Sequence, residues 1–115
     1  MNNQKEQIKY FKFPKKLLKD EDFKNQSANV KIIMVYLLSL YDSFGTYIFW
    51  QKPSEFAKEI GIDYVTLWRA KKELDKFGIE IKQNKKRWLF NIMKFLKKYM
   101  EFKDDIESLQ IVSNI

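Results

Sequence analysis

Residues 64–77 have the residue types and spacing that point most directly to a chemical role. Apolar residues recur there at steps of three and four: Leu67, Ala70, Leu74 and Phe77. This spacing predicts a helix from Tyr64 to Phe77 with a single buried stripe. The exposed face and its flank would carry aromatic, small and basic side chains: Tyr64, Val65, Thr66, Trp68, Arg69 and Lys72. An α-helix fits the major groove of DNA, where Arg donates to guanine, methyl groups touch thymine and Lys contacts phosphate. We therefore predict that this face binds double-stranded DNA.

Two short runs of alternating apolar and polar residues follow, at residues 79–82 and 88–92. Alternation of this kind predicts the two strands of an antiparallel hairpin, with residues 83–87 as the loop and Gly78 ending the helix before it. Four basic residues lie at this hairpin: Lys82, Lys85, Lys86 and Arg87. Their positive charge would attract a phosphate backbone that lies beside the helix.

A shorter helix is predicted just before residue 61. Pro53 suits its first turn, because the amide at that position has no helical partner. Gly61 lies where the chain must turn, since glycine readily adopts the left-handed conformation. Asp63 would cap the next helix, because its carboxylate accepts hydrogen bonds from the free amides at a helix start. Two helices joined by a tight turn are therefore predicted between residues 53 and 77.

The longest helix is predicted from Ala28 to about Tyr41, with Ser27 as its N-cap. Its broad apolar face belongs at the centre of a small domain. Residues 42–45 would form a turn, and residues 46–50, which are β-branched and aromatic, would form a strand that pairs with the hairpin.

The N-terminal segment begins with residues 1–9, which are polar and which we expect to be loose. The following stretch interleaves lysines with four large apolar residues: Phe11, Phe13, Leu17 and Leu18. Aromatic rings beside positive charge could form an arm that grips DNA. Packing of these four side chains on the core, with the lysines in solvent, is the favoured interpretation.

Residues 93–115 are predicted to form an amphipathic helix and a tail after a main domain at residues 10–92. Apolar residues recur there with heptad spacing: Ile92, Phe95, Tyr99, Phe102, Ile106 and Leu109. Such a stripe can pair two copies of the chain or pack on its own domain, and both arrangements stay open. A homodimer is the expected assembly.

The composition restricts the classes of function. A chain of 115 residues with 45% hydrophobic residues suits one folded domain. The net charge is +7, and residues 64–103 include twelve basic and four acidic residues. A surface of this kind attracts nucleic acid or an anionic membrane. The absence of Cys and His excludes zinc fingers, disulfide frameworks, thiol nucleophiles and histidine acid–base chemistry.

Catalysis is not expected of the remaining side chains. Asp63, Glu73 and Asp75 could in principle hold a metal in a nuclease, but their positions suit a helix cap and solvated helix faces. We therefore expect no enzyme activity, no metal and no cofactor. The sequence has no run of about 18 apolar residues and no signal peptide, so we expect a cytoplasmic protein that does not enter a membrane.

The order strand, helix, turn, helix, glycine and basic hairpin resembles a winged helix-turn-helix domain over about residues 45–92. The small, turn and core residues of that family fall here on Ala57, Gly61, Leu67 and Ala70. The resemblance implies a mainly α fold with a small antiparallel sheet, an α+β class, followed here by a C-terminal helix. It also implies DNA binding through the second helix and the hairpin.

A narrower resemblance joins the FKFPKKLL segment, the long helix and the GTYIFW strand to this pattern. Together they are similar to the N-terminal domains of plasmid and phage replication initiators of low-GC Gram-positive bacteria. The implied function is binding of a specific site on a plasmid or other mobile element, to help assemble a replication or conjugative-transfer complex with a replication protein or a relaxase. The alternatives are a transcriptional regulator with the same fold, and a protein-interaction module that uses Trp68 and the C-terminal helix.

Overall fold

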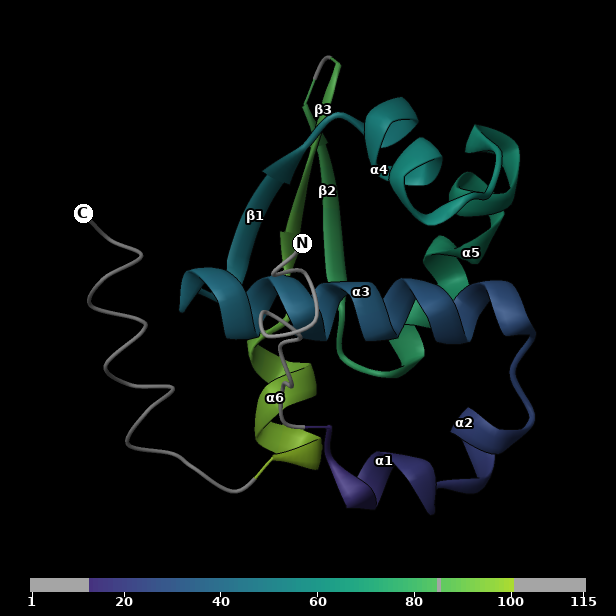
Figure 1. Cartoon of the computed structure of the whole chain (residues 1–115), viewed down its shortest axis with the longest axis vertical. Coiled ribbons are helices and arrows are strands. Elements are labelled where there is room, and N and C mark those ends of the chain that lie inside the picture. Colours follow the sequence, from purple (N-terminus) through teal and green to yellow (C-terminus); the bar gives the residue numbers. More distant parts are fainter. Residues whose placement is uncertain (1–12, 85, 101–115) are drawn as a thin grey trace, which may run out of the picture.

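Helix α3 (Ala28–Phe44) crosses the middle of the molecule and divides it into two layers (Figure 1). In this computed structural model, residues 13–84 and 86–100 are described. One layer contains the sheet and two helices: β1 (Ile48–Gln51), β2 (Glu80–Asn84), β3 (Arg87–Asn91), α4 (Pro53–Ile60) and α5 (Tyr64–Lys76). The other layer contains three short helices: α1 (Lys15–Leu18), α2 (Glu21–Lys24) and α6 (Met93–Tyr99). The predicted α+β class, mainly helical with a small antiparallel sheet, is confirmed.

Helix α3 is central because it carries one broad apolar face. Six of its residues are buried: Val30, Ile33, Met34, Leu37, Leu38 and Leu40. As predicted, Ser27 caps the helix, and its Oγ accepts a hydrogen bond from the Val30 amide at 3.2 Å. The predicted turn at residues 42–45 is wrong, because the helix continues to Phe44. Gly45 ends it with a left-handed φ of 65°, and the Gly45 amide donates to the Tyr41 carbonyl.

The three strands form an antiparallel sheet in the order β1-β3-β2. The predicted pairing of the first strand with the hairpin is therefore confirmed, although β1 begins at Ile48 rather than at Thr46. Phe49 and Phe90 face each other across β1 and β3, and both are buried. The Phe56 ring of α4 stacks on Phe90 with centroids 4.9 Å apart, so α4 covers this inner face of the sheet.

The hairpin is tighter than predicted. Asn84 pairs with Arg87, so the strands extend into the expected loop of residues 83–87 and leave two residues at the tip. The α4–α5 segment matches its prediction closely. Gly61 has a φ of 78°, and Oδ1 of Asp63 accepts a hydrogen bond from the Thr66 amide at 2.7 Å. These local features fix where α5 begins.

The second layer closes the core from below α3 in the view of Figure 1. Leu17 is fully buried and Phe13 packs partly on the core, as the favoured interpretation predicts. Leu18 is 51% exposed, so its predicted core position is wrong. The reason is that α1 spans four residues and turns one side to the core. Phe11 lies outside the described residues.

Helix α6 packs on its own domain. Phe95, Leu96 and Tyr99 are buried, and the Tyr99 hydroxyl donates to Asp20 at 3.1 Å. Burial, and then this hydrogen bond to Asp20, raise the pKa of Tyr99. Met100 is extended, with φ −120° and ψ 143°, so α6 ends at Tyr99. The predicted heptad residues after Tyr99 lie outside the described residues.

Among the described helices, none has both the length and the apolar character that a membrane span requires.

Candidate nucleic-acid interface

The exposed side of α5 carries the six predicted residues, which we call the α5 face: Tyr64, Val65, Thr66, Trp68, Arg69 and Lys72. Tyr64 is 44% exposed, and Val65 and Trp68 are each 50% exposed. Arg69 and Lys72 are also exposed, and Thr66 is half-buried. The opposite stripe of Leu67, Ala70 and Leu74 is buried, so α5 is anchored on α3 and α4 through its apolar side. The predicted division of this helix into a buried and an exposed side is confirmed.

A lysine between two tryptophans joins α5 to the hairpin. The Lys71 ammonium lies 5.0 Å from the ring centroid of Trp68 and 5.1 Å from that of Trp88 in β3. The Tyr64 ring lies 5.9 Å from the same Trp88 ring. A cation–π contact contributes about 0.5–1 kcal/mol at an exposed site. Lys71 therefore links Trp68 of α5 to Trp88 of the hairpin and favours the packing of the hairpin on α5.

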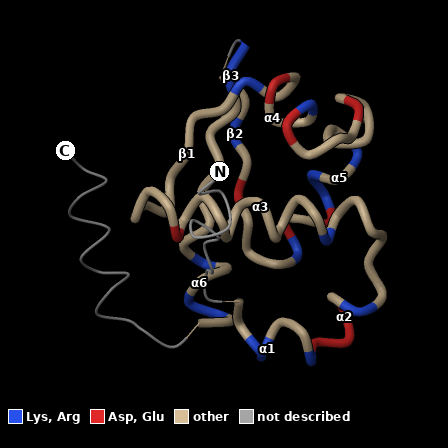
Figure 2. Tube along the Cα trace, viewed as in Figure 1, with Lys and Arg blue, Asp and Glu red and all other residues tan. Residues whose placement is uncertain are grey.

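The basic residues of the hairpin occupy both its tip and its outer face. Lys86 and Arg87 are exposed at the tip, while Lys85 lies outside the described residues. Lys82 pairs with Leu89, and Arg87 pairs with Asn84, on the face opposite to buried Trp88 and Phe90. The structure therefore brings Trp88, the residue after Arg87, against α5, but places Lys82 and Arg87 on the opposite face of the hairpin. Figure 2 shows basic residues at the hairpin tip and along α5, while α3 is mostly uncharged.

A groove of about 410 Å³ runs between the start of α3 and α5. Arg69 and Thr66 line it from α5, and Asn29 and Ser27 line it from the first turn of α3. The N-terminal end of a helix carries partial positive charge, which adds to that of Arg69. Glu73 also lines this groove. Ser27 and Asn29 are not among the DNA-binding residues predicted from the sequence. No local spacing could reveal them, because they reach α5 only when the helices pack.

The three carboxylates considered for catalysis have other partners or lie apart. The amide hydrogen bond from Thr66 lowers the pKa of Asp63 below its usual value. Glu73 accepts a hydrogen bond from Gln26 at 3.0 Å and one from Lys76, and these bonds lower its pKa. Asp75 is exposed on the following turn. Within residues 13–84 and 86–100, no three carboxylates gather closely enough to hold a metal ion.

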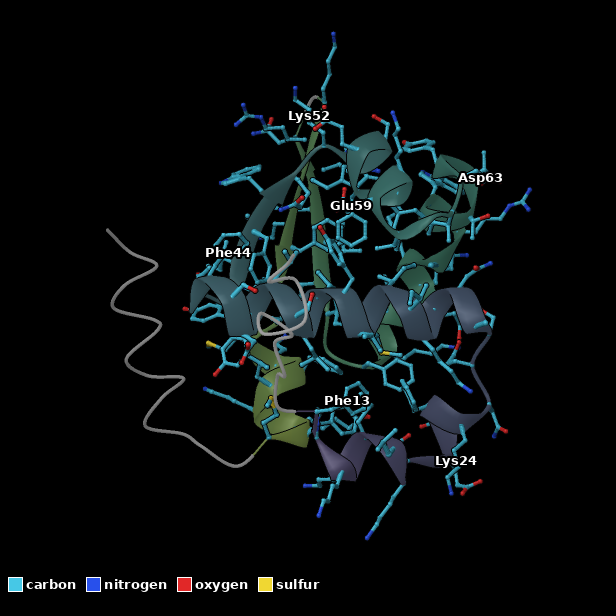
Figure 3. The ribbon with its side chains drawn as sticks, in the orientation of Figure 1. Phe13, Lys24, Phe44, Lys52, Glu59 and Asp63 are labelled. Carbon is cyan, nitrogen blue, oxygen red and sulfur yellow. The ribbon has the colours of Figure 1, made fainter. Side chains whose placement is uncertain are left out.

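Comparison with protein-family models, with curated proteins and with solved structures finds no significant match to this chain. The chemistry and geometry of the α5 face and the hairpin are therefore the basis on which a function can be assigned. Figure 3 shows the side chains on the ribbon, with Lys52 near the hairpin tip and Asp63 beyond the C-terminal end of α4.

Proposed function

We propose that this protein binds double-stranded DNA as a winged helix-turn-helix domain, with α5 in the major groove and the hairpin tip on the adjacent backbone. The observation that carries the proposal is the α5 face itself, which combines Arg69 and Lys72 with small and aromatic side chains beside a basic hairpin. The element order and the strand order β1-β3-β2 are compatible with such a domain. The Lys71 contacts support the proposal further, because they link α5 to the hairpin that would lie on the DNA backbone.

Each residue of the surface has a role that follows from its chemistry. Arg69 reads a base, since its guanidinium can donate two hydrogen bonds to guanine. Val65 and Thr66 contact base edges or the backbone near the start of α5. Lys72 neutralises a phosphate, and the hairpin residues Lys85, Lys86 and Arg87 neutralise phosphates beyond it. The groove beside Arg69 lets a DNA backbone approach the positive end of α3.

The biological role proposed for this binding is recognition of a site on a plasmid or other mobile element. There the protein would act in the cytoplasm as a homodimer and help to assemble a replication or transfer complex with a replication protein or a relaxase. Regulation of transcription from such a site uses the same chemistry and is the second candidate. Duplex binding is common to both, so it is the property to test first.

A protein-interaction role for Trp68 rests on the 50% exposure of its side chain, because exposed tryptophans often anchor interfaces. The interaction module would also use the C-terminal helix. The described part of that helix, α6, packs on its own domain, which does not favour this role. Trp68→Ala separates the two roles. Loss of a protein partner with unchanged DNA affinity favours the interaction module.

The experiment that tests duplex binding is a fluorescence-anisotropy titration over a series of salt concentrations, with random duplex DNA and with fragments from the protein's genetic neighbourhood. The informative variant is the triple change Arg69→Gln, Lys72→Gln and Lys86→Gln. Its matched control is Lys15→Gln, Lys16→Gln and Lys97→Gln, which removes the same charge from exposed positions of α1 and α6.

We expect the α5–hairpin variant to bind weakly to every fragment and to lower the salt slope by about two, because about one counterion is released for each phosphate contact. The control variant should keep the affinity of the wild type for its preferred fragment. Equal losses in both variants would mean that net charge alone attracts the DNA, and the proposed surface would be rejected.

A further inference from the structure

The outer face of the sheet carries a tryptophan that the core does not use. Phe49 and Trp50 are neighbours in β1, and their side chains point to opposite faces of the sheet. Phe49 is 5% exposed and belongs to the core, whereas Trp50 is 50% exposed. Trp50 lies in one row with Leu89 of β3 and Lys82 of β2. A large aromatic ring is therefore presented to solvent beside a positive charge.

A groove of about 310 Å³ lies at this ring, where the end of β1, the start of α4 and the start of β3 meet. Trp50, Gln51, Lys52, Glu55 and Arg87 line it. This volume is at the lower end of the range for small-ligand sites, about 300–1,000 Å³. Lys52 lies near the hairpin tip in Figure 3, which places the groove next to the proposed DNA surface.

The lining groups match the parts of a nucleotide. A base can stack on the Trp50 ring, and the Gln51 amide can both donate to and accept from a base edge. Arg87 can bind the phosphate. Glu55 forms an ion pair with Lys52 at 3.7 Å, so the acid in the groove has its own cation.

Basic residues around the groove could bind the phosphates of further nucleotides in the same strand. Lys82 lies across the sheet from Trp50, and Lys86 lies at the tip beyond Arg87. Glu80, the acid on this face of β2, pairs with Lys94 at 2.9 Å. A polyanion that crosses the outer face therefore meets positive charges that are not neutralised by these acids.

We propose that this groove, the Trp50 groove, binds an unpaired nucleotide of a single-stranded nucleic acid. The Trp50 ring lies on the other side of the sheet from the α5 face, because Trp88 and Phe90 occupy the inner side of the hairpin and Trp50 lies on the outer side. Among the described residues, Arg87 is the one that this groove shares with the proposed duplex surface. If the proposed duplex binding is correct, duplex and single strand lie on opposite sides of the hairpin. The hairpin would then lie at the junction where the two DNA strands of a duplex separate. Binding of a single strand by the groove does not itself depend on duplex binding.

The test is a titration of the full chain with oligothymidylate and with oligouridylate, followed by anisotropy of the labelled strand and by quenching of tryptophan fluorescence. The informative variants are Trp50→Ala, Trp50→Phe and Arg87→Gln. Phe44→Ala is the matched control, because Phe44 is an exposed aromatic at the end of α3, outside both the α5 face and the Trp50 groove. Trp50 is outside the core, so these variants should keep the thermal transition of the wild type.

We expect Trp50→Ala to weaken single-strand binding about tenfold or more and to remove most of the quenching, since stacking on one aromatic ring contributes this much. Trp50→Phe should keep most of the affinity, Arg87→Gln should lower the salt dependence, and Phe44→Ala should bind like the wild type. A third titration with oligodeoxyuridylate separates the effect of the 2′-hydroxyl from that of the thymine methyl group, and the sugar that binds more tightly with the same base is the preferred one.

Wild-type affinity of Trp50→Ala for both strands would overturn the proposal. A change in oligomeric state in Trp50→Ala without a change in strand binding would also overturn it, because the ring would then serve contact with a second copy. Duplex affinity of Trp50→Ala is measured in parallel. If the wild type fails to bind duplex but binds the oligonucleotides through Trp50, the duplex proposal fails and the groove stands.

Discussion

Arg69 and Lys72 differ in what they can do, although both are cations on the exposed side of α5. Replacement of Arg69 by Ala should cost about 1–3 kcal/mol at the preferred site and relax the choice of sequence, because a bidentate base contact is lost. Replacement of Lys72 by Ala should weaken binding to all duplexes and reduce the salt slope by about one. Competition titrations with altered sites measure both effects. Identical behaviour of the two variants would show that Arg69 does not read a base.

Lys71 contributes to stability through two aromatic neighbours, because its ammonium contacts both Trp68 and Trp88. Lys71→Gln should lower the free energy of unfolding by about 1–2 kcal/mol, since two cation–π contacts are lost. Lys72→Gln, the adjacent exposed lysine, should change stability by less than about 0.5 kcal/mol. Urea unfolding of the two variants provides the comparison. Equal stabilities would show that the two aromatic contacts of Lys71 contribute nothing measurable.

The residue types on α5 could be assigned from sequence because helical spacing alone decides which side each one occupies. Tyr64, Trp68 and Arg69 are exposed as that spacing predicts. The contacts of Lys71 with Trp88 could not be assigned, since they join residues 17 positions apart through the packing of α5 on the hairpin. Trp50 was missed as a site for a related reason. Its exposure depends on which face of the sheet is covered.

The two glycines that follow α4 and α5 differ in how closely other atoms surround them. Gly61 has a φ of 78° and open space where a Cβ would lie, whereas a Cβ on Gly78, at φ 90°, would lie 2.9 Å from the Phe95 amide nitrogen. Gly61→Ala should cost about 1–2 kcal/mol from the left-handed backbone alone. Gly78→Ala should cost about 1–3 kcal/mol more, because the start of α6 must move. Chemical denaturation of both variants tests this order, and a smaller cost at Gly78 would contradict the packing of α6 against that turn.

The stability that the Asp63 cap gives to α5 depends on pH, because the cap is an ionisable carboxylate. The Thr66 amide lowers the pKa of Asp63, so the stabilisation is present above the ordinary carboxyl pKa, near 3.9, and is lost as the pH falls through the lowered value. Asn can accept the same hydrogen bond without a charge. Asp63→Asn should therefore unfold at a temperature that changes less with pH between about 2 and 4. Thermal unfolding across this range measures it, and parallel curves for the two proteins would contradict the role of the charge.

Caps and turns at the element scale were predictable because their causes are local. Ser27, Gly61 and Asp63 act within three or four residues of their own positions. The sequence predicts the end of α3 too early, near Tyr41, because Asp42 and Ser43 resemble turn residues, whereas the helix runs to Phe44 and ends at the left-handed Gly45. The exposure of Leu18 could not be predicted, because it depends on which side of α1 packs on the core.

At the scale of the whole molecule, α3 separates two surfaces with different tasks. The layer with α4, α5 and the sheet presents the α5 face and the hairpin, whereas the layer with α1, α2 and α6 completes the core (Figure 1). Lysines occur in both layers, and Lys15 and Lys16 lie far along the chain from the proposed interface. Net charge alone therefore does not distinguish one layer from the other, and the proposed interface is predicted instead from the combination of side chains on α5.

The most direct test of the central claim is an NMR titration of the isotope-labelled full chain with duplex DNA, read as amide chemical-shift changes along the backbone. We expect the largest changes at the start of α5, at the hairpin tip and at the first turn of α3, because these segments border the proposed DNA surface. Amides of α1 and α6 should change little. Changes concentrated on α1 and α6, or spread evenly over all lysine-bearing segments, would contradict a DNA-binding surface built on α5.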